Sequence, residues 1–131
     1  MMIFDASSII NLFEQKKIEK VMNGFCLNLS IYELGNFVWK ISNLYKIINL
    51  NEGINLLEAL IDIFNSLNKI ETKSEDYLEI LKIAYKENLT FYDASYLHAA
   101  IKNNLPLVTD DEKLYTASKK YIKTLKSNEI S

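Results

Sequence analysis

The segment Thr90-Phe91-Tyr92-Asp93-Ala94-Ser95-Tyr96-Leu97-His98-Ala99-Ala100 is a polar turn that leads into an alanine-rich, apolar stretch. It predicts a helix with an acid, Asp93, in its first turn. Thr90-x-x-Asp93 fits a capping box, in which Thr90 caps a backbone N–H and Asp93 lies at the positive end of the helix dipole. An acid at this place is usually structural. Three other acids in comparable positions, each at the boundary of an expected strand or helix, make a functional role worth testing.

Length and composition favour one folded domain spanning residues 1–131. The chain is 49% apolar and 24% charged, which is typical of globular proteins. Its net charge of −2 provides no broad basic field, and all fifteen basic residues are lysines. A nucleic acid would therefore have to be held by local lysines or through metal ions, without the forked contacts that arginine makes to phosphate.

Cysteine content and the N-terminal sequence argue against a disulfide-bonded, a multi-cysteine zinc-binding, a secreted or a membrane protein. Cys26 is the only cysteine, which excludes an internal disulfide and a multi-cysteine zinc site. The N-terminus has neither a basic region nor a long apolar region of the signal-peptide kind, and the chain has no run of about 18 apolar residues. We therefore expect no membrane segment and a cytoplasmic location.

The first residues indicate the type of sheet. Met1–Phe4 is a continuous apolar run, as expected for a strand buried on both faces of a parallel sheet. Asp5 would then lie at the carboxyl end of that strand, which is the edge where open α/β sheets bind ligands.

The rest of the chain alternates between helical and strand patterns, which predicts an α/β fold. Apolar stripes on the three longest helices are expected to pack on the sheet or on each other, and a partner-binding groove is the alternative. The further strands are expected at Phe25–Leu29, Leu105–Val108 and, at an edge, Tyr121–Leu125. The helices are expected at Ile9–Phe13, Lys16–Asn23, Ser30–Tyr45, Asn51–Leu67, Ser74–Asn88, Asp93–Lys102 and Lys113–Lys120. Asn68–Lys73 is expected to be a short link and Lys126–Ser131 a frayed tail.

Four acidic positions follow strand ends or open helices: Asp5, Glu33, Asp93 and the pair Asp110/Asp111. Right-handed crossovers between parallel strands would bring them to one edge of the sheet. Carboxylates that converge there repel one another and have raised pKa values unless a cation neutralises them. Hard oxygen ligands suit Mg²⁺ or Mn²⁺, on which a bound water becomes a nucleophile toward a phosphodiester.

Two local patterns favour a structural interpretation. Ser30-x-x-Glu33 also fits a capping box, so Glu33 could serve the helix end alone. His98, the only histidine, follows Asp93 by five residues and would lie about 140° around the helix from it. We expect His98 to be a core or rim residue and not a catalytic one.

Four segments together resemble the PIN domain, specifically the small VapC-type toxins of toxin–antitoxin pairs. The resemblance extends from Met2 to about Tyr115, with the segments in the family's order. They are Ile3-Phe4-Asp5-Ala6-Ser7-Ser8, Ser30-Ile31-Tyr32-Glu33-Leu34-Gly35-Asn36, Thr90-Phe91-Tyr92-Asp93-Ala94-Ser95-Tyr96 and Leu107-Val108-Thr109-Asp110-Asp111.

This resemblance implies a three-layer α/β/α sandwich with a central parallel sheet of about four to five strands. It also implies a Mg²⁺- or Mn²⁺-dependent endoribonuclease that acts on RNA, is often a homodimer and is held inactive by a protein antitoxin. Asp5 and Asp93 match the family's principal metal-binding acids, and Glu33 matches the helix acid that completes the pocket.

The resemblance also assigns the supporting positions of the site. Ser7 matches the small hydroxyl residue after the first acid, and Thr109 lines the site. The last acid is Asp111 by the family motif, with Asp110 as the adjacent alternative. Family members use basic residues near the cleft for RNA, for which Lys40 and Lys113 are the candidates here.

Two other protein classes could also place acids at these positions. A phosphoacceptor receiver domain also gathers acids at strand ends, but it requires an aspartate on a middle strand that this chain lacks. A catalytically inactive, PIN-like interaction module would use the acids only as helix caps and bind a partner through the helices at Asn51–Leu67 and Ser74–Asn88. Binding of Mn²⁺ distinguishes the module from the nuclease, because separate caps would not bind the ion as a set.

Overall fold

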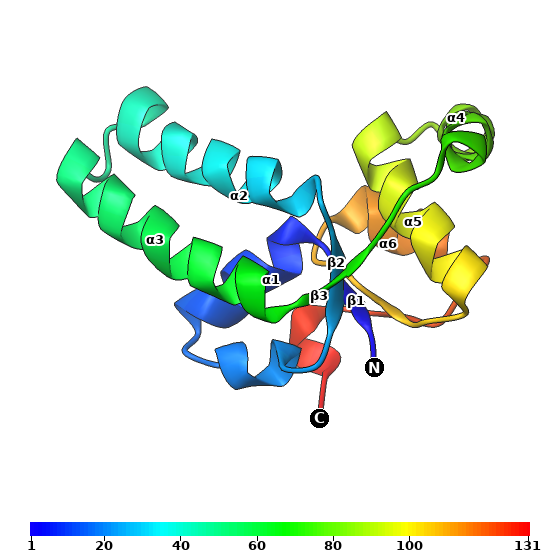
Figure 1. Ribbon diagram of the computed structural model, residues 1–131, viewed down its shortest axis with the longest axis horizontal. Helices are drawn as coiled ribbons and strands as arrows, with labels where there is room; N and C mark the ends of the chain where they lie inside the picture. Colours follow the sequence, from blue (N-terminus) through cyan, green and yellow to red (C-terminus); the bar gives the residue numbers. More distant parts are fainter.

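A five-stranded parallel sheet runs through the centre of the protein in a computed structural model that describes residues 1–131 (Figure 1). Its strand order is β3-β2-β1-β4-β5. The strands are β1 (Ile3–Phe4), β2 (Phe25–Leu27), β3 (Asn68–Ile70), β4 (Leu107–Val108) and β5 (Thr124–Leu125). The helices are α1 (Ala6–Glu14), α2 (Ser30–Trp39), α3 (Leu50–Ser66), α4 (Ser74–Glu87), α5 (Phe91–Asn103) and α6 (Glu112–Ser118).

The two faces of the sheet build two separate cores. Ile3 and Leu107 pack with residues of α4, α5 and α6, whereas their neighbours Phe4 and Val108 pack with residues of α1, α2 and α3. All four side chains are buried, and burying each contributes about 1.5–3 kcal/mol. Figure 1 shows the same division, with α1, α2 and α3 on one side of the sheet and α4, α5 and α6 on the other. The predicted three-layer α/β/α fold with a parallel sheet is confirmed.

The strand order reverses at β1. The chain proceeds outward from β1 to β2 and β3, and then returns through α4 and α5 to place β4 on the other side of β1. Ile3 pairs with Leu107 and Phe4 with Val108. The residues after β1 and β4 therefore lie side by side at the point where ligands bind in open α/β sheets.

Two helices end as their sequences suggest. Asn88 follows α4 and Asn104 follows α5, and both have left-handed backbone conformations with φ of 54° and 51°. Asparagine tolerates this conformation better than most residues, which makes it a common helix stop.

Two expected elements near the second strand were wrong. Lys16–Asn23 contains only a 3₁₀ turn, η1 (Ile18–Val21), and is bounded by Lys16 and Asn23, whose positive φ values of 58° and 64° interrupt helical geometry. Asn68–Lys73 is more than a link, because its first three residues form β3 beside β2. An edge strand of this kind pairs through its backbone, so the side-chain pattern did not reveal it.

Two further boundaries differ from expectation. The helix expected at Ser30–Tyr45 is α-helical only to Trp39 and continues as a π-helical turn, η2 (Lys40–Leu44). Lys126–Ser131, expected to be a frayed tail, contains a 3₁₀ turn, η3 (Ser127–Glu129), in which Ser127 is buried. The Ser127 N–H donates a hydrogen bond to Asp110 Oδ1 at 2.9 Å, which ties the tail to the end of β4.

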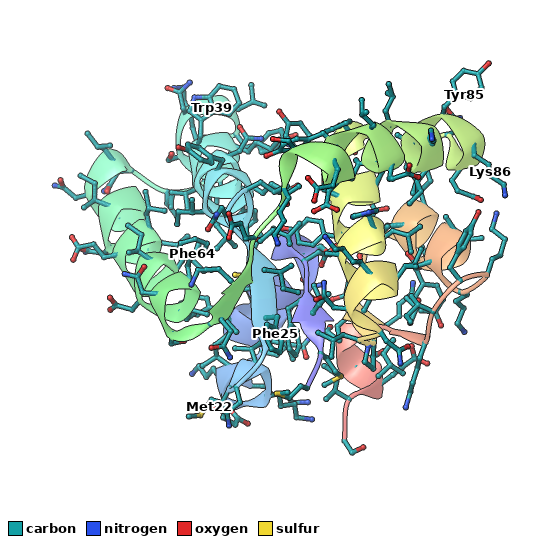
Figure 2. All side chains as sticks on the ribbon, turned by 45° about the vertical axis from the view of Figure 1, so that its right-hand side comes forward. Met22, Phe25, Trp39, Phe64, Tyr85 and Lys86 are labelled. Atoms are coloured by element: carbon teal, nitrogen blue, oxygen red, sulfur yellow. The ribbon has the colours of Figure 1, made fainter.

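The apolar stripe expected on α4 is only partly buried. Ile80 and Ala84 are buried, but Leu78, Leu81 and Tyr85 are exposed. Helix α4 packs against α5 and covers no other helix closely, so only one side of it is protected (Figure 1). Figure 2 shows Tyr85 extending from the outer end of α4 into solvent.

No helix of the protein combines the length and the apolar content that a transmembrane segment requires.

Two glycines provide a test of the packing. A Cβ at Gly24 would lie 2.7 Å from the Phe4 ring and 2.8 Å from the Val21 carbonyl oxygen, whereas a Cβ at Gly35, in α2, would meet nothing within 4 Å. We expect Gly24→Ala to lower the free energy of unfolding by about 1–3 kcal/mol. Gly35→Ala should instead raise it by up to about 1 kcal/mol through helix propensity. Urea unfolding of both variants measures the difference, and equal effects would contradict this packing of Gly24.

Candidate active site

Asp5 is a buried carboxylate at the carboxyl end of β1. The residue is 4% exposed, and its side chain caps α1 by accepting a hydrogen bond from the Ser8 N–H at 3.0 Å. The Ser7 hydroxyl donates to the same oxygen at 2.8 Å, and the Thr109 hydroxyl donates to the other oxygen. Burial nevertheless raises the pKa of Asp5 to about 6, so desolvation outweighs the hydrogen bonds that favour the charged form.

Ser7 and Thr109 also join the ends of β1 and β4. Ser7 Oγ accepts a hydrogen bond from the Asp110 N–H at 3.0 Å, and Thr109 Oγ1 accepts one from the Asp111 N–H at 3.1 Å. Each hydroxyl therefore donates to Asp5 and accepts from the loop after β4. This arrangement fixes Asp5 relative to the backbone of the loop that carries both acids.

Glu33 lies in the first turn of α2 and is oriented by a chain of hydrogen bonds. The Leu27 N–H of β2 donates to Ser30 Oγ at 3.2 Å, Ser30 shares a 2.7 Å hydrogen bond with the Tyr96 hydroxyl, and Tyr96 donates to Glu33 Oε1 at 2.7 Å. Burial and, to a smaller extent, the charges of Asp5 and Asp93 raise the pKa of Glu33 to about 7, although the Tyr96 hydrogen bond lowers it. Glu33 is therefore electrostatically coupled to both acids.

Asp93 lies in the first turn of α5, where its N–H donates to Thr90 Oγ1 at 3.1 Å. Burial raises the pKa of Asp93, and the charge of Asp111 raises it further, whereas Lys113 lowers it. Through these couplings Asp5, Glu33, Asp93 and Asp111 form one continuous acidic group.

The two acids after β4 have different surroundings. Asp110 accepts hydrogen bonds from the Asn11 side chain at 2.8 Å and from the Ser127 N–H, so both of its oxygens are occupied by groups of the scaffold. Asp111 caps α6 through the Leu114 N–H at 2.8 Å, is exposed, and acts on the charge of Asp93. These contacts favour Asp111 over Asp110 as the acid of the site.

Of the two capping patterns in the sequence, one forms as a cap and one does not. Thr90 caps α5 as expected. The Ser30–Glu33 capping box was wrong, because α2 begins after Leu29 without a side-chain cap, and both Ser30 and Glu33 bond to Tyr96 instead. Glu33 is thus held by a tertiary contact.

His98 lies on α5 with its side chain 14% exposed and with Nε2 3.8 Å from Asp76 Oδ1. Lys102 Nζ lies 2.9 Å from the same oxygen. Asp76 also accepts a hydrogen bond from the Lys73 N–H at the start of α4. The cluster ties α4 to α5, as expected for a histidine at the core rim.

Tyr96 is a residue of the site whose role the sequence analysis missed. It is 1% exposed, and burial together with the Glu33 charge raises its pKa well above the ordinary value, so its hydroxyl keeps its proton and donates. The available signal was a tyrosine on an otherwise apolar, alanine-rich helix face, since a buried tyrosine hydroxyl usually has a partner.

The donor set fits a hard divalent cation bound partly through water. All of its candidate ligands are carboxylate or hydroxyl oxygens. No set of three His, Cys, Asp or Glu side chains is arranged to hold one ion. Mg²⁺ takes only one or two carboxylates directly and keeps several waters, so donors of this kind suit such an ion.

A model of the PIN domain family matches residues 2–120. The chain belongs to the PIN domain family. It is 36% identical over 93 residues to "Exonuclease VapC9" of Pyrobaculum aerophilum, a match that covers 71% of this chain and 65% of that protein. It is 30% identical over 125 residues to "Ribonuclease VapC3" of the same organism, covering 86% of this chain and 91% of that protein. These matches confirm the predicted resemblance to VapC-type PIN proteins.

The fold of this PIN domain is similar to a solved structure. The crystal structure of PAE2754 from Pyrobaculum aerophilum superposes with a TM-score of 0.77 at 29% sequence identity. The similarity covers 94% of this chain and 87% of that chain.

The raised pKa values of this PIN domain predict a pH-dependent stability in the absence of metal. A carboxyl group whose pKa is higher in the folded than in the unfolded state stabilises the fold below its unfolded pKa, and this contribution is lost as the pH rises through the folded value. For Asp5 and Glu33 the loss occurs through about pH 6 and 7. We expect a higher melting temperature at pH 5 than at pH 8 when a chelator is present.

The matched variant is Glu33→Gln, whose amide oxygen can still accept the Tyr96 hydrogen bond but does not titrate. It should show a smaller change in melting temperature over the same pH range. An identical pH dependence in wild type and variant would contradict the raised pKa of Glu33.

Proposed function

We propose that this PIN domain is a Mg²⁺- or Mn²⁺-dependent endoribonuclease and the toxin of a toxin–antitoxin pair. The observation that carries the proposal is the coupled acidic group beside the junction of β1 and β4, in which Asp5 is buried. Such a group is costly to the ion-free protein, because burial and mutual repulsion both oppose its ionisation. A bound cation would remove that cost.

Asp5 and Asp93 would hold the ion, and Glu33 and Asp111 would complete its surroundings and position water. When bound, the ion would activate a water and stabilise negative charge on the phosphodiester. The chain itself contributes orientation: Ser7 and Thr109 fix the Asp5 carboxylate, and Tyr96 fixes Glu33. With a pKa of about 7, Glu33 can hold or release a proton near neutral pH.

The names of the two relatives support nuclease activity but differ in type, since one is named an exonuclease and the other a ribonuclease. A circular single-stranded RNA distinguishes the two modes, because it has no ends. We expect the protein to open such a circle in the presence of Mn²⁺. Degradation of linear RNA alone would instead assign exonuclease activity.

A partner is part of the proposal. Leu78, Leu81 and Tyr85 stay exposed on α4, and Leu44, Tyr45 and Ile47 stay exposed beyond the end of α2. These apolar surfaces support association with an antitoxin and with a second copy of the chain as a homodimer in the cytoplasm. The same surfaces support the rival proposal of an inactive interaction module, so metal binding and cleavage must decide between the two.

Asp93→Asn should keep the fold and abolish both Mn²⁺ binding and RNA cleavage. The amide retains the size of the side chain, and the N–H bond to Thr90 is unchanged, but the charge that holds the cation is lost. We expect cleavage to fall by at least about 100-fold. Calorimetry with Mn²⁺, circular dichroism and an RNA-cleavage assay measure the three properties.

Asp62→Asn, an exposed site on α3, is the matched control and should behave as wild type. Loss of folding in Asp93→Asn would support the purely structural role of this acid. Absence of Mn²⁺ binding by the wild-type protein would remove the basis of the metal-dependent proposal.

The pair Asp110→Asn and Asp111→Asn tests which acid after β4 serves the site. We expect Asp111→Asn to impair cleavage at unchanged stability, because asparagine can also cap α6. Asp110→Asn should instead lower the melting temperature, because it weakens the contacts to Asn11 and Ser127, while cleavage below that temperature is retained. The opposite pattern would assign the site to Asp110.

A further inference from the structure

Two grooves meet beside the acidic group, along the carboxyl edge of the sheet. The larger, of about 700 Å³, lies between α1, α2 and the start of α5, and Glu33 lines it. The smaller, of about 250 Å³, lies between β2, α4 and α5. Leu29 and Tyr92 line both, so the two grooves are adjacent and share these two side chains.

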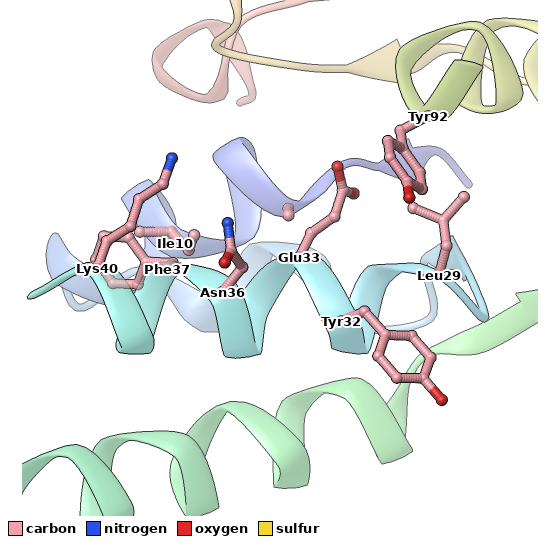
Figure 3. A pocket seen from close by; sticks show the side chains of 9 residues that line it. Ile10, Leu29, Tyr32, Glu33, Asn36, Phe37, Lys40 and Tyr92 are labelled. Carbon is pink, nitrogen blue, oxygen red and sulfur yellow. The ribbon is translucent and has the colours of Figure 1, made fainter. Parts of the chain in front are cut away.

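The larger groove carries polar groups on one face of α2. Asn36 and Lys40 follow Glu33 by three and seven residues, which places all three side chains on the same side of the helix. Figure 3 shows the Lys40 ammonium group, the Asn36 amide and the Glu33 carboxylate pointing to this side, and Tyr92 extending toward the Glu33 end from α5. A ligand in this groove would therefore touch the acidic group.

Aromatic faces continue through the smaller groove. Tyr92 is 61% exposed, although it stands at the centre of the two grooves. Beyond it, Tyr77 and Phe91 are stacked with ring centroids 6.4 Å apart and an interplanar angle of 21°, and both line the smaller groove. Exposed aromatic side chains along a groove are the stacking platforms of proteins that bind single-stranded nucleic acid.

The charges around the grooves restrict how such a strand could be held. Lys40 is the only cationic residue that lines either groove, and the nearby acids repel phosphate. Phosphate contacts therefore contribute little to affinity here. Since every base has a π-face, stacking can supply the affinity that the missing arginines do not.

We propose that the two grooves bind successive nucleotides of single-stranded RNA, with the Tyr92 ring as the shared stacking platform and Lys40 as the single phosphate contact. This rests on the proposed ribonuclease function and deepens it, because it places the bases on both sides of Tyr92 next to Glu33. Asn36 lies within the larger groove as a group that can hydrogen-bond a base edge or the sugar.

The test measures the binding of a short, fluorescein-labelled oligoadenylate to the full chain by anisotropy, in a chelating buffer that prevents cleavage. Tyr92→Leu removes the ring and should weaken binding about 5- to 100-fold, which corresponds to the loss of one base stack. Tyr92→Phe should bind nearly as wild type. Tyr121→Leu removes a partly exposed tyrosine that lines neither groove and should have no effect.

Two further measurements separate stacking from charge. An abasic oligomer, which keeps all phosphates, should bind wild type at least as weakly as oligoadenylate binds Tyr92→Leu. The logarithm of the wild-type binding constant should fall with the logarithm of the salt concentration at a slope of about −0.7, as expected for one phosphate contact, and Lys40→Ala should flatten it. Equal binding by wild type and Tyr92→Leu would overturn the proposal and leave a protein segment as the occupant of the grooves. A salt slope of about −3 or steeper would also overturn it, because several phosphates would then be contacted.

Failure of this proposal and failure of the ribonuclease function can be distinguished. The binding comparison uses no divalent cation and no cleavage readout. Cleavage that persists in Mn²⁺ while Tyr92→Leu binds as wild type would overturn the stacking site alone. Ring-dependent binding without any cleavage would support the site and contradict the ribonuclease.

Discussion

The hydrogen bond from the Thr109 hydroxyl to the buried Asp5 carboxylate is the contact on which the rest of the site depends. It joins the residues that follow β1 and β4, which are neighbours only because the chain returns to the opposite side of β1 after building β2 and β3. Without it, Asp5 would lose one of the few donors that compensate its removal from water. Hydrogen bonds to a charged group contribute about 1.5–3 kcal/mol each, yet those at Asp5 leave its pKa raised.

That imbalance is informative about function. A carboxylate that served only to cap α1 could do so at an exposed position without a desolvation cost. Here Asp5 is buried and acts on the charge of Glu33, a second carboxylate with a raised pKa, which the Tyr96 hydroxyl holds in place. The fold uses neutral donors, namely Ser7, Thr109 and Tyr96, to orient these acids, and leaves their charge to be neutralised from outside. This arrangement is the basis of the proposed cation-dependent active site.

The same electrostatics governs the surface around the site. A chain with net charge −2 and no arginine cannot attract RNA by a broad positive field. The exposed rings of Tyr92, Tyr77 and Phe91 next to the acids offer a contact that does not depend on charge. Two lysines lie near the site. Lys40 lines the larger groove, and Lys113 is close enough to Asp93 to lower its pKa.

The sequence alone determined the type of fold and the positions of the acids. The apolar runs that end at Asp5 and at Thr109 predict buried parallel strands. This prediction needs no knowledge of tertiary contacts, because the composition of a short segment is a local property. The end of α4 at Asn88 was predictable for the same reason. Only the tertiary structure decided the features that depend on residues distant in the chain. Pairing with β2 made a strand of Asn68–Ile70, and a hydrogen bond from Tyr96 holds Glu33. Asn11 and Ser127 bond to Asp110, whereas the charge of Asp111 raises the pKa of Asp93. Hydrogen-bond partners across about 17 to 100 residues follow from the path of the whole chain, and no local pattern encodes that path.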